Sequence, residues 1–148
     1  HVSQEFPLYT ALPVAENLSF FADLYRVPRA VRAARTRDLL AWSRLTAFRD
    51  RTAGKLSGGM QKKLHLCCTL IHDPELLLLD EPTMGVDPVS RRELWEILHD
   101  LAGRGLTLVV APPDMDEAGK GHPAALMHPG ARLRCDIAAL FPPESGAR

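Results

Sequence analysis

Four consecutive leucines, Leu76 to Leu79, constrain the fold more than any other part of the sequence. A uniformly apolar run of this length is typical of a parallel β-strand that is covered on both faces. The run ends directly in Asp80-Glu81-Pro82. Since α/β sheets place ligand chemistry at the carboxyl ends of their strands, Asp80 is positioned to hold a hydrated Mg²⁺ and Glu81 to polarise an attacking water.

Apolar residues recur at helical spacing on both sides of the leucine run, and this spacing predicts amphipathic helices. Four segments are predicted to be helical: Val14–Tyr25 (with Leu18, Phe21 and Tyr25 on one face), Ala30–Leu45, the stretch from Ser57-Gly58-Gly59 to Asp73-Pro74, and the stretch that carries Leu94, Ile97, Leu98 and Leu101. Leu106–Val110 is predicted as a second buried strand and Ala124–Met127 as a third candidate. Helices followed by strand, helix and strand indicate a helical subdomain that leads into a parallel α/β core.

The composition suits a single domain in a reducing compartment. The 148 residues are 46% hydrophobic, and 18 Lys and Arg balance 18 Asp and Glu. This balance gives no electrostatic reason to expect binding to nucleic acid. No apolar run approaches the roughly 18 residues that span a bilayer, and three cysteines do not make a disulfide framework. We expect a cytoplasmic protein without a membrane span of its own.

A second motif precedes the leucine run, in Leu56-Ser57-Gly58-Gly59-Met60-Gln61. Glycines at a helix start leave backbone N–H groups uncovered, and these groups form an anion site together with the serine hydroxyl and the helix dipole. Such a site suits a phosphate. Each motif also has an ordinary structural explanation: Ser57-Gly58-Gly59 as a loop and helix cap, and Asp80-Glu81-Pro82 as a polar turn after a strand.

Taken together and in this order, the motifs resemble the ATP-binding-cassette (ABC) family. Ser57-Gly58-Gly59 is similar to the family's signature motif, and the segment from Leu76 to Thr83 is similar to its Walker B motif. Met84-Gly85-Val86-Asp87-Pro88 follows at once and is similar to its D-loop. The resemblance implies an α/β fold of the P-loop NTPase-like ABC ATPase type.

The resemblance extends upstream of these motifs and covers roughly residues 2 to 140. Gln4 is similar to the family's Q-loop glutamine, and Asn17 to Tyr25 is similar to the exporter branch that handles drugs, antibiotics or lipids. The whole chain, residues 1–148, is then one partial nucleotide-binding domain. Its expected parts are the Q-loop and helical subdomain with the signature motif (about 5–72), the Walker B, D-loop and C-terminal α/β core (about 73–140) and a tail (141–148).

The resemblance also implies a mechanism. Two cassettes, identical or different, would pair head to tail and sandwich two ATP molecules. Gln4 and Asp80 would hold Mg²⁺, partly through water, and Glu81 would be the general base. Ser57-Gly58-Gly59 would face the γ-phosphate bound to the partner cassette, and Asp87 would communicate across the interface. ATP binding and hydrolysis would drive a transmembrane permease from the inner face of the cell membrane.

Two features depart from the family's pattern. No Gly-x-x-x-x-Gly-Lys-Ser/Thr occurs in the sequence, which opens His1-Val2-Ser3-Gln4. We therefore expect an N-terminally truncated fragment that binds ATP poorly and is inactive alone. Aligning Met115-Asp116-Glu117-Ala118 with the family's similar run places Pro113 where the family has its switch histidine. Proline offers neither a side-chain donor nor a backbone N–H, so the γ-phosphate contact is lost there.

Two other functions stay open beside that of an exporter ATPase. One is a noncatalytic, degenerate half that lends its signature motif to a competent partner cassette. The other is a soluble cassette protein that acts on ribosomes or DNA, which would normally carry basic or coiled-coil insertions. A metal site at Cys67 and Cys68 is disfavoured, because adjacent residues on a helix diverge in direction and suit buried packing. Arg32, Arg35 and Arg37 are interpreted as a solvated helix face.

Overall fold

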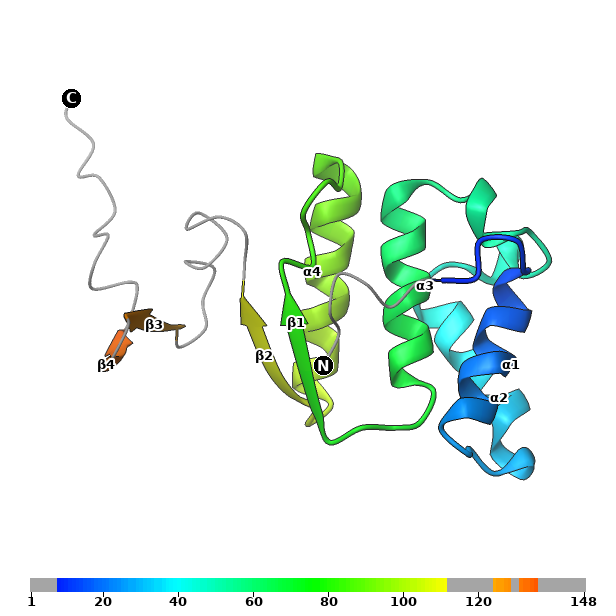
Figure 1. Ribbon diagram of the computed structural model, residues 1–148, viewed down its shortest axis with the longest axis horizontal. Coiled ribbons are helices and arrows are strands. Elements are labelled where there is room, and N and C mark those ends of the chain that lie inside the picture. Colours follow the sequence, from blue (N-terminus) through cyan, green and yellow to red (C-terminus); the bar gives the residue numbers. More distant parts are fainter. Residues whose placement is uncertain (1–7, 112–123, 129–130, 136–148) are drawn as a thin grey trace. The chain divides into compact units, whose positions relative to one another are not determined.

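Figure 1 shows a computed structural model of the chain, which describes residues 8–111, 124–128 and 131–135. The chain divides into two compact units, residues 1–111 and 112–148. The elements of the first unit are α1 (Val14–Leu24), α2 (Arg29–Trp42), the 3₁₀ turns η1 (Thr46–Phe48) and η2 (Ala53–Lys55), α3 (Gly58–Leu70), β1 (Leu76–Asp80), α4 (Pro88–Gly103) and β2 (Thr107–Ala111). The four predicted helices and the first two predicted strands are therefore confirmed.

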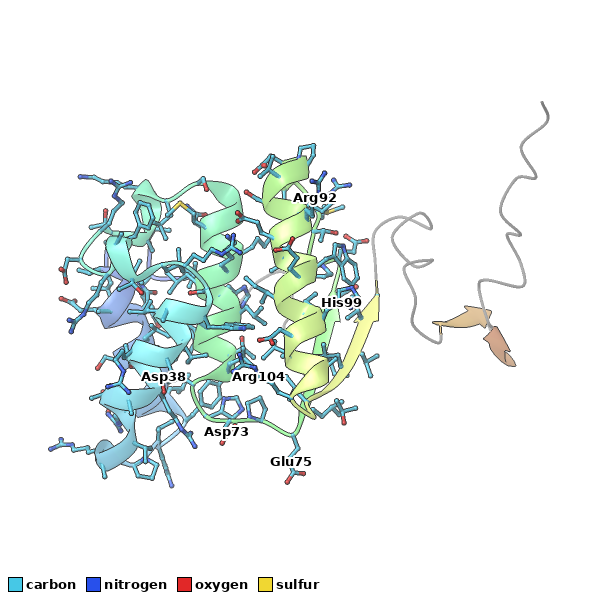
Figure 2. All side chains as sticks on the ribbon, turned by 180° about the vertical axis from the view of Figure 1, so that it is seen from behind. Asp38, Asp73, Glu75, Arg92, His99 and Arg104 are labelled. Carbon is cyan, nitrogen blue, oxygen red and sulfur yellow. The ribbon has the colours of Figure 1, made fainter. Side chains whose placement is uncertain are left out.

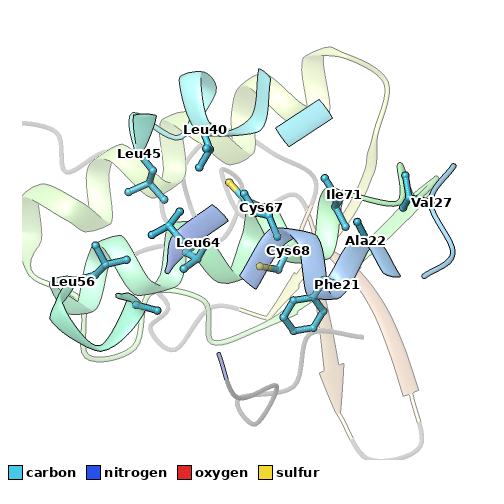
Figure 3. Packing of buried hydrophobic residues seen from close by; sticks show 13 residues of the cluster. Phe21, Ala22, Val27, Leu40, Leu45, Leu56, Leu64, Cys67, Cys68 and Ile71 are labelled. Atoms are coloured by element: carbon cyan, nitrogen blue, oxygen red, sulfur yellow. The ribbon is translucent and has the colours of Figure 1, made fainter. Parts of the chain in front are cut away.

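The helical half of the first unit, residues 8–71, closes around a core of its own (Figure 3). Leu18, Leu64 and Ile71 have no exposed surface. Of the face predicted for α1, Leu18 and Phe21 are buried, whereas Tyr25 is 37% exposed because it already lies at the carboxyl cap of the helix. The core cluster contains Val14, Leu18, Phe21, Ala22, Val27, Leu40, Leu45, Ala53, Leu56, Leu64, Cys67, Cys68 and Ile71.

A buried asparagine ties the segment before α1 to the first turn of that helix. The Oδ1 atom of Asn17 accepts a hydrogen bond from the Tyr9 N–H at 2.9 Å, and its Nδ2 atom donates to the carbonyls of Tyr9, Leu12 and Pro13 at 3.1 to 3.2 Å. Asn17 has no exposed surface. Because a buried amide must be hydrogen-bonded to be tolerated, these partners explain why a polar residue lies in the core.

The sheet half of the first unit, residues 75–111, consists of β1, α4 and β2. The two strands are parallel, with Leu76 opposite Thr107 and Asp80 opposite Ala111. Leu77 and Leu79 are buried in a second cluster, to which α3 and α4 both contribute side chains. Leu76, in contrast, is 51% exposed. The expectation that the leucine run is covered on both faces was therefore wrong for the described residues, since α3 and α4 pack against the same face.

The arginines of α2 do not form a uniformly solvated face. Arg32 pairs with Asp23 and donates from Nε to the Val27 carbonyl at 2.7 Å. Arg35 donates to the Ile71 carbonyl and to Asp73, at 3.1 and 3.0 Å, and so reaches the turn between α3 and β1, where Figure 2 shows Asp73. These contacts join α2 to the ends of α1 and α3, which the sequence pattern did not predict.

The second unit contains a two-stranded antiparallel sheet in its described residues. β3 (Ala124–His128) pairs with β4 (Ala131–Cys135), with Ala124 opposite Cys135. The predicted strand over Ala124–Met127 is confirmed, but its antiparallel partner was missed. Within the described part of the chain, no helix is long and apolar enough to cross a membrane.

Candidate functional site

The predicted carboxylates lie at the carboxyl end of β1. Asp80 is the last residue of the strand and is exposed. Glu81 follows it, and its N–H donates to the carbonyl of Ala111 at the end of β2, at 2.8 Å. This bond continues the parallel register by one residue beyond the strands. The sheet itself therefore fixes the backbone from which both carboxylates project.

Glu81 has an unusual backbone conformation, with a φ of 46°. Three other non-glycine residues with positive φ in the described part of the chain, Arg26, Arg44 and Asp73, follow the ends of helices, where a left-handed residue commonly ends the helix. Glu81 instead follows a strand. A non-glycine residue held in this region costs about 1–3 kcal/mol and is found preferentially at functional sites. No sequence pattern predicted this conformation.

Two overlapping turns lead from Glu81 to α4. The Glu81 carbonyl accepts from the Met84 N–H at 3.1 Å, and the Thr83 carbonyl accepts from the Val86 N–H at 3.2 Å. Thr83 is fully buried, and Gly85 has a φ of 70°, which glycine adopts without steric cost. The turns therefore hold the segment between the carboxylates and α4 in one conformation.

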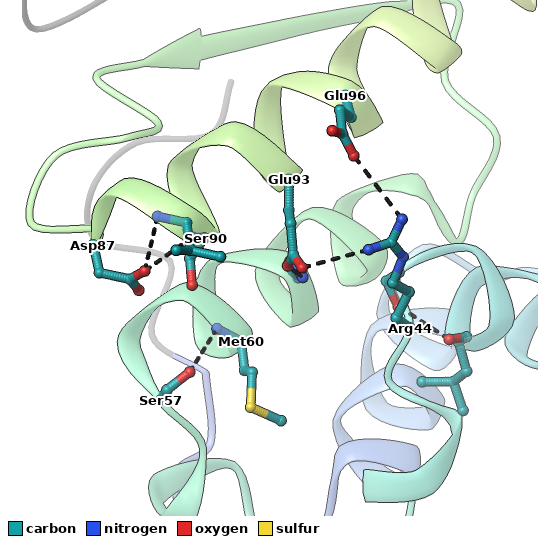
Figure 4. A network of polar contacts seen from close by, with 11 residues as sticks. Arg44, Ser57, Met60, Asp87, Ser90, Glu93 and Glu96 are labelled. Atoms are coloured by element: carbon teal, nitrogen blue, oxygen red, sulfur yellow. Dashed lines mark hydrogen bonds and ion pairs between the residues drawn. The ribbon is translucent and has the colours of Figure 1, made fainter.

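Asp87 caps the amino end of α4. Its Oδ1 atom accepts from the N–H groups of Val89 and Ser90 at 3.1 and 2.9 Å, as Figure 4 shows. Hydrogen bonds from the hydroxyl and the N–H of Ser90, followed by that from Val89, lower the pKa of the Asp87 carboxyl. Pro88 occupies the first helical position, where no N–H is needed. Asp87 thus has a structural role at the start of α4.

Ser57 caps the amino end of α3 in a similar way. Its Oγ atom accepts from the Met60 N–H at 3.3 Å. The preceding turn is held by Gln61, whose Nε2 atom donates to the carbonyls of Ala53 and Leu56 at 3.2 and 3.3 Å. The helix cap considered for this motif is therefore present. A Cβ added to Gly58 would meet nothing within 4 Å, which leaves open space beside the free N–H groups of the helix start.

Gly59 differs from Gly58, because it is buried against the start of α4. A Cβ at Gly59 would lie 2.4 Å from both the Cβ and the Oγ of Ser90. One turn further along, the buried Lys63 of α3 forms an ion pair with Glu93 of α4, and Arg44 donates to the same carboxylate at 3.4 Å. We call this contact between α3 and α4 the α3–α4 seam. It brings the predicted signature segment next to the Asp87 cap.

The predicted site residues thus fall into two groups. Asp80 and Glu81 are tied to the end of β2. In the segment Ser57-Gly58-Gly59, Gly59 lies against Ser90, which is bonded to Asp87. Gln4 and Pro113 lie outside the described residues. Sequence reasoning missed Ser90, Lys63 and Glu93, which form the α3–α4 seam. A buried lysine one turn after two glycines carries no sequence signal, because the same pattern occurs on solvated helices.

The cysteines of α3 are packing residues, as predicted. Cys67 and Cys68 are both fully buried and free. Burial raises the pKa of the Cys67 thiol to about 12 and that of Cys68 well above its usual range. The described residues hold no group of three or more histidine, cysteine or acidic side chains that could bind a metal ion.

Residues 1–84 match the protein family described as ABC transporter, which is more than half of the chain. The chain belongs to the ABC transporter family. The matched region contains Ser57-Gly58-Gly59, Asp80 and Glu81, whereas Asp87 and α4 lie beyond it. The family predicted from the motifs is therefore confirmed.

Individual members of the ABC transporter family show the same relationship. The chain is 47% identical to the probable multidrug ABC transporter ATP-binding protein YbhF of Escherichia coli K12, over 90% of this chain and 23% of that protein. It is 33% identical to Nod factor export ATP-binding protein I of Paraburkholderia xenovorans, over 88% of this chain and 48% of that protein. The chain therefore spans less than half the length of these relatives. The predicted resemblance to the exporter branch is confirmed.

A solved structure supports the ABC ATPase fold. The chain is similar to cbiO1 from Clostridium perfringens, described as part of the ABC transporter complex cbiONQ. The TM-score is 0.66 and the identity 27%, over 74% of this chain and 44% of that one. The match agrees with the mixed helices and small parallel sheet of the first unit.

Proposed function

We propose that this chain belongs to the ATP-hydrolysing subunit of an ABC exporter and supplies its signature segment, its hydrolytic carboxylates and its D-loop. The observation that carries the proposal is Glu81. The end of β2 holds it at a positive φ directly after Asp80, at the carboxyl end of a parallel strand. This is the position at which α/β folds carry ligand chemistry.

The described residues fit a magnesium nucleotide. Asp80 offers an exposed carboxylate, the kind of ligand that Mg²⁺ prefers. For Gln4, which lies outside the described residues, we propose a coordinating role partly through water. When bound, Mg²⁺ neutralises charge that develops on the phosphates. Glu81 would accept the proton of the attacking water as general base. The backbone bond to Ala111 fixes the main chain from which the Glu81 side chain extends.

The start of α3 would serve the nucleotide of a second cassette. Ser57 and Gly58 are exposed, and the open space at Gly58 admits a phosphate to the positive end of the helix dipole. Asp87 would face the same interface from the start of α4. The partner cassette could be a second copy or a different chain. A transmembrane permease would bind the pair at the inner face of the cell membrane. The relatives are described as ATP-binding proteins of transport or export and as part of a transporter complex, which supports a role in transport.

The test is ATP turnover by the protein expressed from its complete reading frame, with Glu81→Gln. Loss of a general base lowers turnover by about 10²–10⁴-fold. Glu75→Gln is the matched control, because Glu75 is an exposed glutamate immediately before the same strand, at its opposite end, as Figure 2 shows. We expect Glu75→Gln to retain wild-type turnover. Equal turnover by the wild type and Glu81→Gln would refute the role of Glu81.

A degenerate half that only lends its signature segment is the second candidate. It is favoured by Pro112-Pro113, which directly follow Ala111, the residue whose carbonyl accepts the Glu81 N–H. Neither proline has an N–H to donate to the γ-phosphate. The same measurement separates the two candidates. ATP binding without turnover in the wild type would support the degenerate half, whereas turnover that depends on Glu81 would support the hydrolysing subunit.

A further inference from the structure

The two glycines of the signature segment have different surroundings. At Gly58 an added Cβ would meet no atom within 4 Å, whereas at Gly59 it would lie 2.4 Å from two atoms of Ser90. Such a distance is far below van der Waals contact, so a side chain at Gly59 would force α3 and α4 apart. Glycine is therefore required at position 59 by a neighbour within the same chain.

Ser90 contacts the D-loop as well as α3. Its N–H donates to the Asp87 Oδ1 atom at 2.9 Å, and its side chain contributes to the lowered pKa of that carboxyl. Ser90 thus lies beside Asp87, as Figure 4 shows, and its side chain also fills the space where a Cβ at Gly59 would lie. A single small side chain sets the spacing of two segments that are 28 residues apart in the sequence.

The next turn of both helices keeps the same register. Lys63 is four residues after Gly59, and Glu93 is three residues after Ser90, so each pair lies on one helix face. The Lys63 side chain is 7% exposed and is paired with Glu93. Arg44 adds contacts to Glu93 and Glu96. Because a buried lysine without its partner is strongly unfavourable, this pair resists sliding of α3 along α4.

We propose that Ser90 is a positioning residue, which holds the amino end of α3 against Asp87 so that both segments reach the partner cassette as one unit. The inference rests on the proposed function, in which both segments face that cassette. Ser90 itself touches no nucleotide. It acts by setting where the Ser57 cap and the open N–H groups at Gly58 lie relative to Asp87.

The test enlarges the side chain at position 59 and then reduces the one at position 90, on the other side of the α3–α4 seam. The readout is ATP turnover by the protein expressed from its complete reading frame. Gly59→Ala should lower kcat by up to about 100-fold, since displacement of a binding group by an ångström has effects of that size. The KM for ATP should change little, because the displaced groups are proposed to stabilise the charge that develops on the γ-phosphate during hydrolysis. Adding Ser90→Gly to Gly59→Ala removes both clashing atoms and should restore most of kcat. Adding Ser90→Ala instead keeps the clashing Cβ and should not.

Two further glycine variants serve as controls. Gly103→Ala, at the exposed end of α4 where an added Cβ meets nothing, should leave turnover unchanged. Gly58→Ala disturbs the open space of the phosphate site, so whatever turnover it loses should not return with Ser90→Gly. Rescue of position 59 alone would show that Ser90 and Gly59 act on each other.

Ser90→Ala alone gives a readout that does not depend on the stability of Gly59→Ala. It keeps the Cβ of Ser90 but removes the hydroxyl that lies against Gly59, so we expect a several-fold lower kcat with little change in KM. Full turnover of Gly59→Ala, or no recovery in the Gly59→Ala/Ser90→Gly protein, would overturn the inference. Glu81→Gln is measured in the same assay. If it abolishes turnover while the Gly59 and Ser90 variants give one of these contrary results, only the role of Ser90 is refuted and the proposed function stands.

Discussion

The helical half and the sheet half of the first unit differ in how completely the described residues cover their apolar surface. In the helical half, large side chains such as Leu18, Leu64 and Ile71 have no exposed area. In the sheet half, Leu76 and Val109 are 51% and 54% exposed. Three helices can surround a shared core, whereas a two-stranded sheet packed by α3 and α4 on one face leaves its other face uncovered.

The four leucines of β1 differ in burial although they are neighbours in the sequence. They are chemically identical, yet Leu77 is 1% exposed and Leu76 is 51% exposed. Alternation along a strand sends neighbouring side chains to opposite faces, so the packing partners decide which leucines are buried. The hydrophobicity of a segment therefore predicts that it is a strand, but not that both of its faces are covered.

The largest effect is expected from truncation of a leucine in the helical half. Leu64→Ala should lower the free energy of unfolding by about 2–5 kcal/mol, because it leaves a cavity in a closed core. Leu76→Ala, the matched truncation in the sheet half, should cost less than about 1 kcal/mol, since much of that side chain is already in water. Urea denaturation of both variants gives the comparison. Equal losses of unfolding free energy would mean that Leu76 is covered in solution. The two halves would then not differ in how completely their apolar side chains are buried.

A smaller effect is expected from loss of the Asn17 hydrogen bonds at the start of α1. Asn17→Ala removes the hydrogen-bond partner of the Tyr9 N–H and of three carbonyls, and should cost about 1–3 kcal/mol. Ser19→Ala is the control, because Ser19 is exposed on the same helix and should change stability by no more than about 0.5 kcal/mol. If both substitutions had the same small effect, the Asn17 hydrogen bonds would not contribute to the stability of the helical half.

The helices could be predicted because their pattern is local. Apolar residues at a period near 3.6 and stops such as Asp73-Pro74 are both visible in the sequence, and the structure places α1, α2, α3 and α4 over the predicted segments. The end of α2 was predicted too late, at Leu45 instead of Trp42. Arg44 adopts a positive φ there, which ends the helix. Glycine in the sequence would indicate such a helix end, whereas arginine does not.

The candidate site was predictable in part. Ser57 and Asp87 could be recognised from their motifs, and both prove to be helix caps, while their contacts with a partner cassette stay predictions. Glu81, which has a positive φ, is bonded through its N–H to Ala111, thirty residues away. The approach of Gly59 to Ser90 depends in the same way on how two helices pack. Contacts between segments distant in sequence leave no periodic pattern, so local reasoning could not find them.

The smallest effect is expected at Cys67, where pH tests how well the helical half is closed. Burial raises the pKa of this thiol from 9.0 to about 12. Below pH 9 the thiol is protonated in the folded and unfolded states alike, so its contribution to stability is fully present there. As the pH rises toward 12, only the unfolded state ionises and this contribution is lost.

Between pH 8 and pH 10 the wild type should therefore lose about 1 kcal/mol more stability than Cys67→Ala, which has no thiol to ionise at that position. Urea denaturation of both proteins at the two pH values measures the difference. Parallel losses would show that the thiolate is tolerated in the folded state. Because an ion is tolerated only where water or a counter-charge reaches it, such a result would contradict the closed core that distinguishes the helical half from the sheet half.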